Sequence, residues 1–137
     1  MFPIICYPCY LGQRLKSFSN SPLQFTKYIN YPKNKVINIP SVSNNLFDNV
    51  KQLYQKNIDI QGPRINIGGD HSMAIATVAA SLQQHPNLKV VWIDAHPDIN
   101  TTNSSTTKNY HGMPLSFLSH LDSDSNLDFI QTRLKLE

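Results

Sequence analysis

The sequence LKVVWIDAHPDIN, residues 88–100, places an apolar run directly before two acids and a histidine. The run at 88–93 is short and apolar on both faces, which predicts a buried strand of a parallel sheet. Asp94, His96 and Asp98 follow at its carboxyl end, where ligands bind in open α/β sheets. Because residues spaced by two project to the same side of an extended chain, these three side chains are expected to converge.

The converging groups point to a divalent metal ion. Two carboxylates aimed at one point repel one another unless a cation lies between them. Oxygen ligands with one or two imidazoles suit Mn(II), Zn(II), Fe(II) or Co(II). His71 follows a second strand-like run at 64–67, and it can reach the same point if the two strands are neighbours. The alternative, a polar surface end to an apolar strand, is disfavoured because it leaves the acids uncompensated.

The rest of the chain alternates strand-like and helix-like segments. Apolar runs predict strands at 4–7, 36–39, 64–67 and 88–93. Helical spacing and start signals predict helices at 22–29, 44–57, 70–84, 113–120 and 126–137. This alternation predicts an α/β fold with a parallel sheet and right-handed crossovers. We find no repeat and no domain boundary, so residues 1–137 are taken as one unit.

Composition excludes several classes of function. The net charge is +3 without a basic stripe, so nucleic-acid binding is not indicated. No apolar run approaches the roughly 20 residues that span a bilayer, and residues 1–11 lack the basic start of a signal peptide. A cytoplasmic protein is therefore expected. Cys6 and Cys9 suggest a redox pair or half a zinc site, but two small apolar residues ending a strand are favoured, since no second pair exists.

Three motifs in order resemble a known family. GGDHS at 68–72, DAHPDIN at 94–100 and HGMP at 111–114 together resemble the ureohydrolases, and among them the arginases most closely. The resemblance is collinear over 3–121. It implies a three-layer α/β/α domain of the arginase/deacetylase kind, of which residues 1–137 are the amino-terminal portion. The family's remaining metal ligands would lie in a second half.

The same resemblance implies a manganese centre with two Mn2+ ions. Asp94 would bridge both ions, His96 would serve one of them, and Asp98 and His71 would serve the other. The acidic turn at 122–128 superficially resembles a missing ligand motif. It follows a helix rather than a strand, however, and we interpret it as a solvated turn.

Further site residues follow from the resemblance alone. His111, 15 residues beyond His96, would be a proton shuttle, a role that suits an imidazole because it titrates near neutrality. Asn100, Thr107 and Asn109 would hold the α-amino and α-carboxylate groups of the substrate.

The implied activity is hydrolysis of the L-arginine guanidinium to L-ornithine and urea. An agmatinase or formimidoylglutamase type of ureohydrolase is the alternative enzyme. A different class also stays open: a catalytically inactive or split-enzyme half that binds a metal or a partner. The partner would be the missing carboxyl-terminal half or, in a homo-oligomer, a second copy of the chain.

Overall fold

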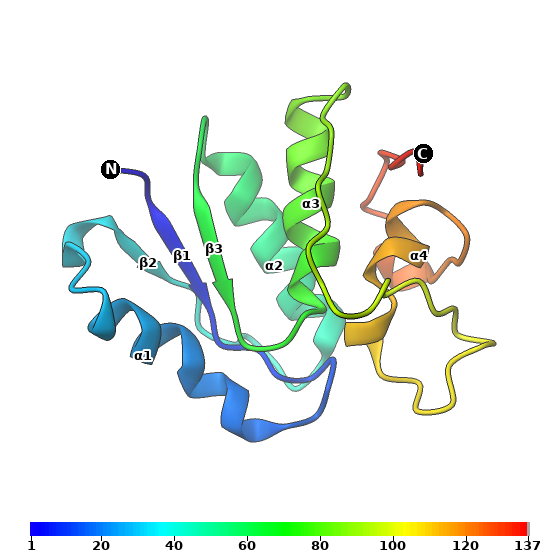
Figure 1. The fold of residues 1–137 in the computed structure, drawn as a ribbon, viewed down its shortest axis with the longest axis horizontal. Coiled ribbons are helices and arrows are strands. Elements are labelled where there is room, and N and C mark those ends of the chain that lie inside the picture. Colours follow the sequence, from blue (N-terminus) through cyan, green and yellow to red (C-terminus); the bar gives the residue numbers. More distant parts are fainter. Residues whose placement is uncertain (137) are drawn as a thin grey trace.

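The structure, a computed structural model, describes residues 1–136 and has the α/β architecture expected from the sequence (Figure 1). Its strands are β1 (Ile4–Tyr7), β2 (Val36–Asn38) and β3 (Ile65–Gly68). Its α-helices are α1 (Ser21–Tyr28), α2 (Leu46–Asp59), α3 (Met73–Gln84) and α4 (Pro114–Leu118). None of the helices in residues 1–136 combines the length and the apolar character that a membrane crossing requires.

The three strands form one parallel sheet in the order β2-β1-β3. Ile5 of β1 lies opposite Ile37 of β2 and Asn66 of β3, so β1 is paired along both edges. Helix α1 connects β1 to β2, and helix α2 connects β2 to β3. Parallel neighbours joined by helical crossovers confirm the predicted fold class.

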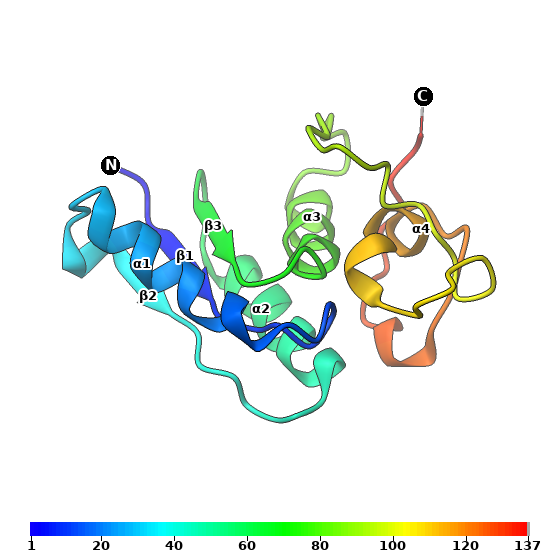
Figure 2. The ribbon, with the colours of Figure 1, turned by 60° about the horizontal axis from the view of Figure 1, so that its bottom comes forward.

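The central strand β1 is buried on both faces, and its alternating side chains separate two layers of helix. Ile5 and Tyr7 join the core that α2 and α3 contribute. Cys6 faces the opposite side, where its Sγ lies 3.8 Å from the carbonyl oxygen of Pro22 in α1. Figure 2 shows α1 on the near side of the sheet with α2 behind it. The chain therefore has the predicted three-layer order of helix, sheet and helix.

Both cysteines are buried and free, as the packing interpretation of Cys6 and Cys9 predicts. Burial raises the pKa of both thiols, so the reactive thiolate is disfavoured at neutral pH. Neither side chain therefore has the character of an activated redox thiol.

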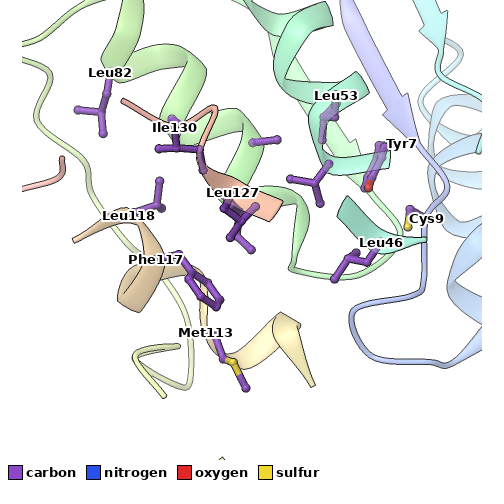
Figure 3. Packing of buried hydrophobic residues seen from close by; sticks show 14 of the residues in the cluster. Tyr7, Cys9, Leu46, Leu53, Leu82, Met113, Phe117, Leu118, Leu127 and Ile130 are labelled. Carbon is purple, nitrogen blue, oxygen red and sulfur yellow. The ribbon is translucent and has the colours of Figure 1, made fainter. Parts of the chain in front are cut away.

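The core extends from the sheet to Leu134, and Figure 3 shows part of it. Leu53 of α2 and Ile75 of α3 are fully buried at its centre. Leu118 of α4 also belongs to this core, and the segment after Leu127 contributes Ile130 and Leu134. Residues 113–134 are thus packed onto α2 and α3 through apolar contacts.

The predicted strand at 88–93 is not formed. Val90 and Trp92 pack against the core, but Val91 and Ile93 on the other side are 82% and 94% exposed. Within residues 1–136, no residue from 89 to 93 makes a hydrogen bond to another backbone group through its own backbone. The prediction of a segment that is apolar on both faces is correct, but within residues 1–136 no neighbouring strand pairs with it.

Other boundaries also differ from the sequence predictions. The predicted helix at 126–137 is wrong over the described residues, where a single 3-10 turn at Ser125–Leu127 leads into an irregular segment. Helix α1 begins at Ser21, one residue before the predicted start, because the 3-10 turn at Lys16–Asn20 runs directly into it. Asn45 is the N-cap of α2, and its side chain accepts a hydrogen bond from the Phe47 amide at 2.8 Å.

The core predicts the cost of truncating its central leucine. Leu53→Ala should lower the free energy of unfolding by about 2–5 kcal/mol, because it opens a cavity among side chains that cannot fully collapse. Urea unfolding followed by circular dichroism measures this change. The control is Leu23→Ala in α1, where the leucine is half exposed and the loss should stay below about 1 kcal/mol. Equal losses in both variants would contradict the packing described here.

Candidate metal centre

A tight turn after β3 places the first site residue. The Gly69 amide donates to the Tyr7 carbonyl at 2.7 Å, and the Asp70 amide donates to the Cys9 carbonyl at 3.0 Å. A Cβ atom at Gly69 would lie 2.1 Å from the Cys9 oxygen, so only glycine allows this approach. The turn brings His71 to the carboxyl edge of the sheet, where the sequence predicted it.

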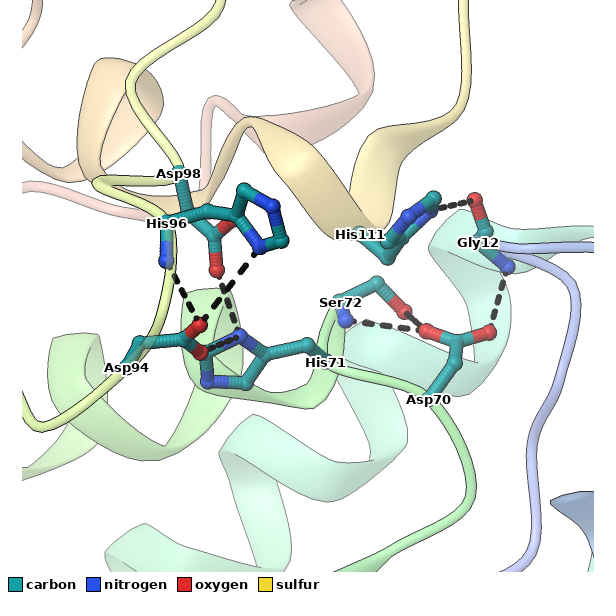
Figure 4. Close-up of polar contacts among 8 residues, drawn as sticks. All are labelled: Gly12, Asp70, His71, Ser72, Asp94, His96, Asp98 and His111. Atoms are coloured by element: carbon teal, nitrogen blue, oxygen red, sulfur yellow. Dashed lines mark hydrogen bonds and ion pairs between the residues drawn. The ribbon is translucent and has the colours of Figure 1, made fainter.

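His71 meets two carboxylates that come from a distant part of the chain (Figure 4). Its Nδ1 lies 2.6 Å from Oδ2 of Asp98 and 3.3 Å from Oδ2 of Asp94. One ligand atom from each of the three side chains lies within 4.8 Å of the other two. In residues 1–136 this is the one group of three or more histidine, cysteine or acidic side chains close enough to hold a metal ion.

The geometry differs from the simple extended-strand prediction. Since 88–93 does not pair with β3, His71 reaches the acids through loops and not through adjacent strands. Asp98 is buried and adopts a left-handed backbone conformation with φ 45°. Its carbonyl accepts a hydrogen bond from the Leu115 amide at 3.0 Å, and the Trp92 ring packs 5.0 Å from the His71 ring.

His96 lies beside the group but outside it. The backbone bends at residues 95 and 96, and the His96 ring is 81% exposed with Nδ1 3.9 Å from Oδ1 of Asp94. The His96 amide also donates to that oxygen at 3.0 Å. This hydrogen bond lowers the pKa of Asp94. Three of the four predicted ligands are therefore assembled, and the role of His96 as a ligand stays a prediction.

The donor set suits one divalent cation. Two carboxylates and an imidazole match the oxygen and nitrogen preferences of Mn(II), Fe(II), Co(II) or Zn(II). Asp98 is buried, so its charge is costly unless it is compensated. The resemblance places His71 and Asp98 on one ion and makes Asp94 a bridge from that ion to a second, and the three side chains lie close enough together to share one ion.

His111 is placed separately, in the 3-10 turn Tyr110–Gly112. Its Nδ1 lies 3.2 Å and its amide nitrogen 3.3 Å from the carbonyl oxygen of Gly12. The Gly112 carbonyl in turn accepts from the Asn100 amide at 3.2 Å. Figure 4 shows His111 next to Gly12 and apart from the ring of His71. His111 is therefore held by Gly12 and does not belong to the cluster of His71, Asp94 and Asp98, which we call the metal group.

The loop at 100–109 is anchored to the rest of the chain. The Thr102 hydroxyl and amide both donate to the Asp122 carboxylate, and the Ser116 hydroxyl donates to the Asn100 carbonyl at 2.7 Å. Further along, the Asn109 amide lies 3.4 Å from the hydroxyl of the exposed Thr107. The substrate-binding role of Asn100, Thr107 and Asn109 stays a prediction.

The acidic turn at 122–128 uses its carboxylates for local structure. Besides the Asp122 contact with the loop, Asp124 accepts hydrogen bonds from the Asn126 amide at 2.9 Å and from the Tyr110 hydroxyl at 2.8 Å. This supports the interpretation of the turn as structural and not as a ligand motif.

Sequence reasoning missed the importance of Asp70 and Gly12. Asp70 is not the N-cap of α3, which is Ser72, and its buried carboxylate accepts a hydrogen bond from the Gly12 amide at 2.8 Å. The sequence signal for this role is the position of Asp70, directly after the Gly68–Gly69 turn and directly before the predicted metal ligand His71.

Comparison with known proteins adds the family. The model of the arginase family matches residues 10–133. An arginase from Schizosaccharomyces pombe is 38% identical over 108 residues, which cover 79% of this chain and 33% of that protein. Arginase-1 from Xenopus laevis is 60% identical over 53 residues, which cover 39% of this chain and 17% of that protein.

Solved structures agree on the fold. The arginase from Bacillus subtilis superposes with a TM-score of 0.79 at 27% identity, covering 98% of this chain and 51% of that one. The Entamoeba histolytica arginase in complex with L-ornithine gives 0.78 at 26% identity, covering 98% and 55%. The chain thus spans about half the length of these structures. Because the family model matches nearly all of the sequence, the chain belongs to the arginase family.

Proposed function

We propose that this chain supplies part of a manganese-dependent centre that hydrolyses the guanidinium group of L-arginine to L-ornithine and urea. The observation that carries the proposal is the convergence of His71, Asp94 and Asp98 at the carboxyl edge of the sheet. Family membership supports it, as does the structural similarity to an arginase solved with L-ornithine.

Each predicted site residue has a definite part in the proposed reaction. His71, Asp94 and Asp98 would hold one ion, and a divalent cation in such a site lowers the pKa of a bound water. His96, whose ring is 81% exposed beside Asp94, would serve a second ion.

The chain's other residues would handle the substrate and the proton. His111 would pass a proton to the leaving amine, because its Nδ1 is engaged by Gly12 and its Nε2 stays available. Asn100, Thr107 and Asn109 would orient the α-amino and α-carboxylate groups of arginine from the loop that begins just after Asp98.

A second candidate function is association with a strand-supplying polypeptide. Val91 and Ile93 are exposed apolar side chains on a segment whose backbone is unpaired within residues 1–136. An unpaired extended segment is a template for strand addition. The occupant we propose is the other half of an arginase fold, because this chain covers only half of the structures that it matches.

The metal group predicts a selective effect on manganese binding. Asp98→Asn should weaken Mn(II) binding at least about tenfold, because affinity for such ions follows the charge of the ligand set. Isothermal titration calorimetry of the purified chain measures this. Asp128→Asn, an exposed acid outside the group, is the matched control and should leave affinity unchanged. Equal affinity for the wild type and Asp98→Asn would place the ion elsewhere.

The proposed reaction predicts urea release that depends on a complementing half. With Mn(II) and the part of Bacillus subtilis arginase that this chain does not cover, we expect urea from L-arginine and much less from agmatine. Asp98→Asn should reduce the rate by about 100-fold or more, at least the effect known for outer-shell groups of metal sites.

Sedimentation of the same mixture separates the two candidate functions. A complex without urea would support association and contradict the catalytic role. Faster release from agmatine would contradict L-arginine as the substrate, and urea release that survives Asp98→Asn would contradict the assigned site.

A further inference from the structure

The carboxylate of Asp70 is a buried junction between two parts of the chain. It is 4% exposed and accepts four hydrogen bonds, of which Figure 4 draws those from Gly12 and Ser72. Its Oδ2 receives the amides of Gly12 at 2.8 Å and Gln13 at 3.1 Å. Its Oδ1 receives the amide of Ser72 at 2.9 Å and the Ser72 hydroxyl. Hydrogen bonds to a carboxylate are among the strongest in proteins, so this junction should hold the loop at 8–14 firmly.

The loop approaches Asp70 so closely that residue 12 must be glycine. A Cβ atom at Gly12 would lie 2.6 Å from Oδ1 of Asp70 and 2.6 Å from Cβ of Ser72. The amide of Gly12 is therefore directed at Asp70, while its carbonyl is left for a partner on the other side. That partner is His111, through both its amide and its ring Nδ1.

The contact with Gly12 determines the state of the His111 ring. A carbonyl oxygen only accepts hydrogen bonds, so Nδ1 must carry the hydrogen. In the neutral ring Nε2 then keeps its lone pair and is the nitrogen that takes up a proton. The tautomer of His111 is thus set by a backbone group that Asp70 holds in position.

We propose that Asp70 is a positioning residue that fixes the tautomer of His111 through Gly12. Asp70 touches neither the ring nor any substrate, and it acts by keeping one carbonyl oxygen within reach of Nδ1. The consequence for proton transfer rests on the proposed function. The tautomer itself does not, so it can be tested in the chain without turnover.

The test is the 15N spectrum of the histidine rings of the purified chain at about pH 8.5, where an ordinary imidazole is neutral. In the wild type, Nδ1 of His111 should show the shift of a protonated ring nitrogen and Nε2 that of an unprotonated one. In Asp70→Ala the two signals should move toward each other as both tautomers become populated. Hydrogen exchange of the Gly12 and Gln13 amides should become at least about tenfold faster, because each amide loses a hydrogen bond to a charged acceptor.

Ser72→Ala is the matched control, because it removes one bond to Oδ1 and leaves the Gly12 bond to Oδ2. It should leave the His111 signals unchanged. A wild-type ring protonated at Nε2 would overturn the proposal even if Asp70→Ala does not fold. Faster exchange at Gly12 with an unchanged ring would also overturn it, since Asp70 would then hold the loop without setting the tautomer.

Discussion

The close approach of Gly69 to the Cys9 carbonyl is the contact on which the site depends. It joins the ends of β1 and β3 at one edge of the sheet, and it leaves no room for a side chain at residue 69. The two residues after Gly69 have different roles. Asp70 ties down the loop that follows β1, and His71 meets the acids at 94 and 98. One backbone contact therefore positions both the metal group and the support of His111.

The metal group forms although the segment before it is unpaired. Residues 94–98 are positioned by two kinds of contact and not by strand pairing. Val90 and Trp92 pack on the core, and the Leu115 amide donates a hydrogen bond to the Asp98 carbonyl. The outer side chains, Val91 and Ile93, stay in water at a cost in apolar exposure. His71, Asp94 and Asp98 therefore converge, while the His96 ring stays 81% exposed with its Nδ1 3.9 Å from Asp94.

Most of the fold could be predicted from local pattern. The strands at 4–7, 36–39 and 64–67 and the helix capped by Asn45 have signals in neighbouring residues, and the structure has them within a residue or two at most boundaries. The prediction of a strand at 88–93 was wrong because pairing is not a local property. Its apolar pattern is correct, but pairing depends on neighbours that the pattern of this segment does not contain.

The site could be predicted in part for similar reasons. The spacing of the acids and the motif resemblance indicated His71, Asp94 and Asp98, which the structure brings together. The bend that turns His96 outward and the junction at Asp70 depend on backbone geometry. Neither the spacing of residues nor their chemistry encodes that geometry in a form that can be read from one sequence.

We propose that His71, Asp94 and Asp98 hold one divalent ion. Substoichiometric Mn(II) broadens the nuclear magnetic resonance signals of nearby nuclei, so a titration of the 15N-labelled chain tests the claim directly. We expect the amide signals around residues 71, 94 and 98 to disappear first, while those of the acidic turn at 122–128 persist. Broadening that begins at the acidic turn, or spreads evenly over the exposed acids, would contradict it.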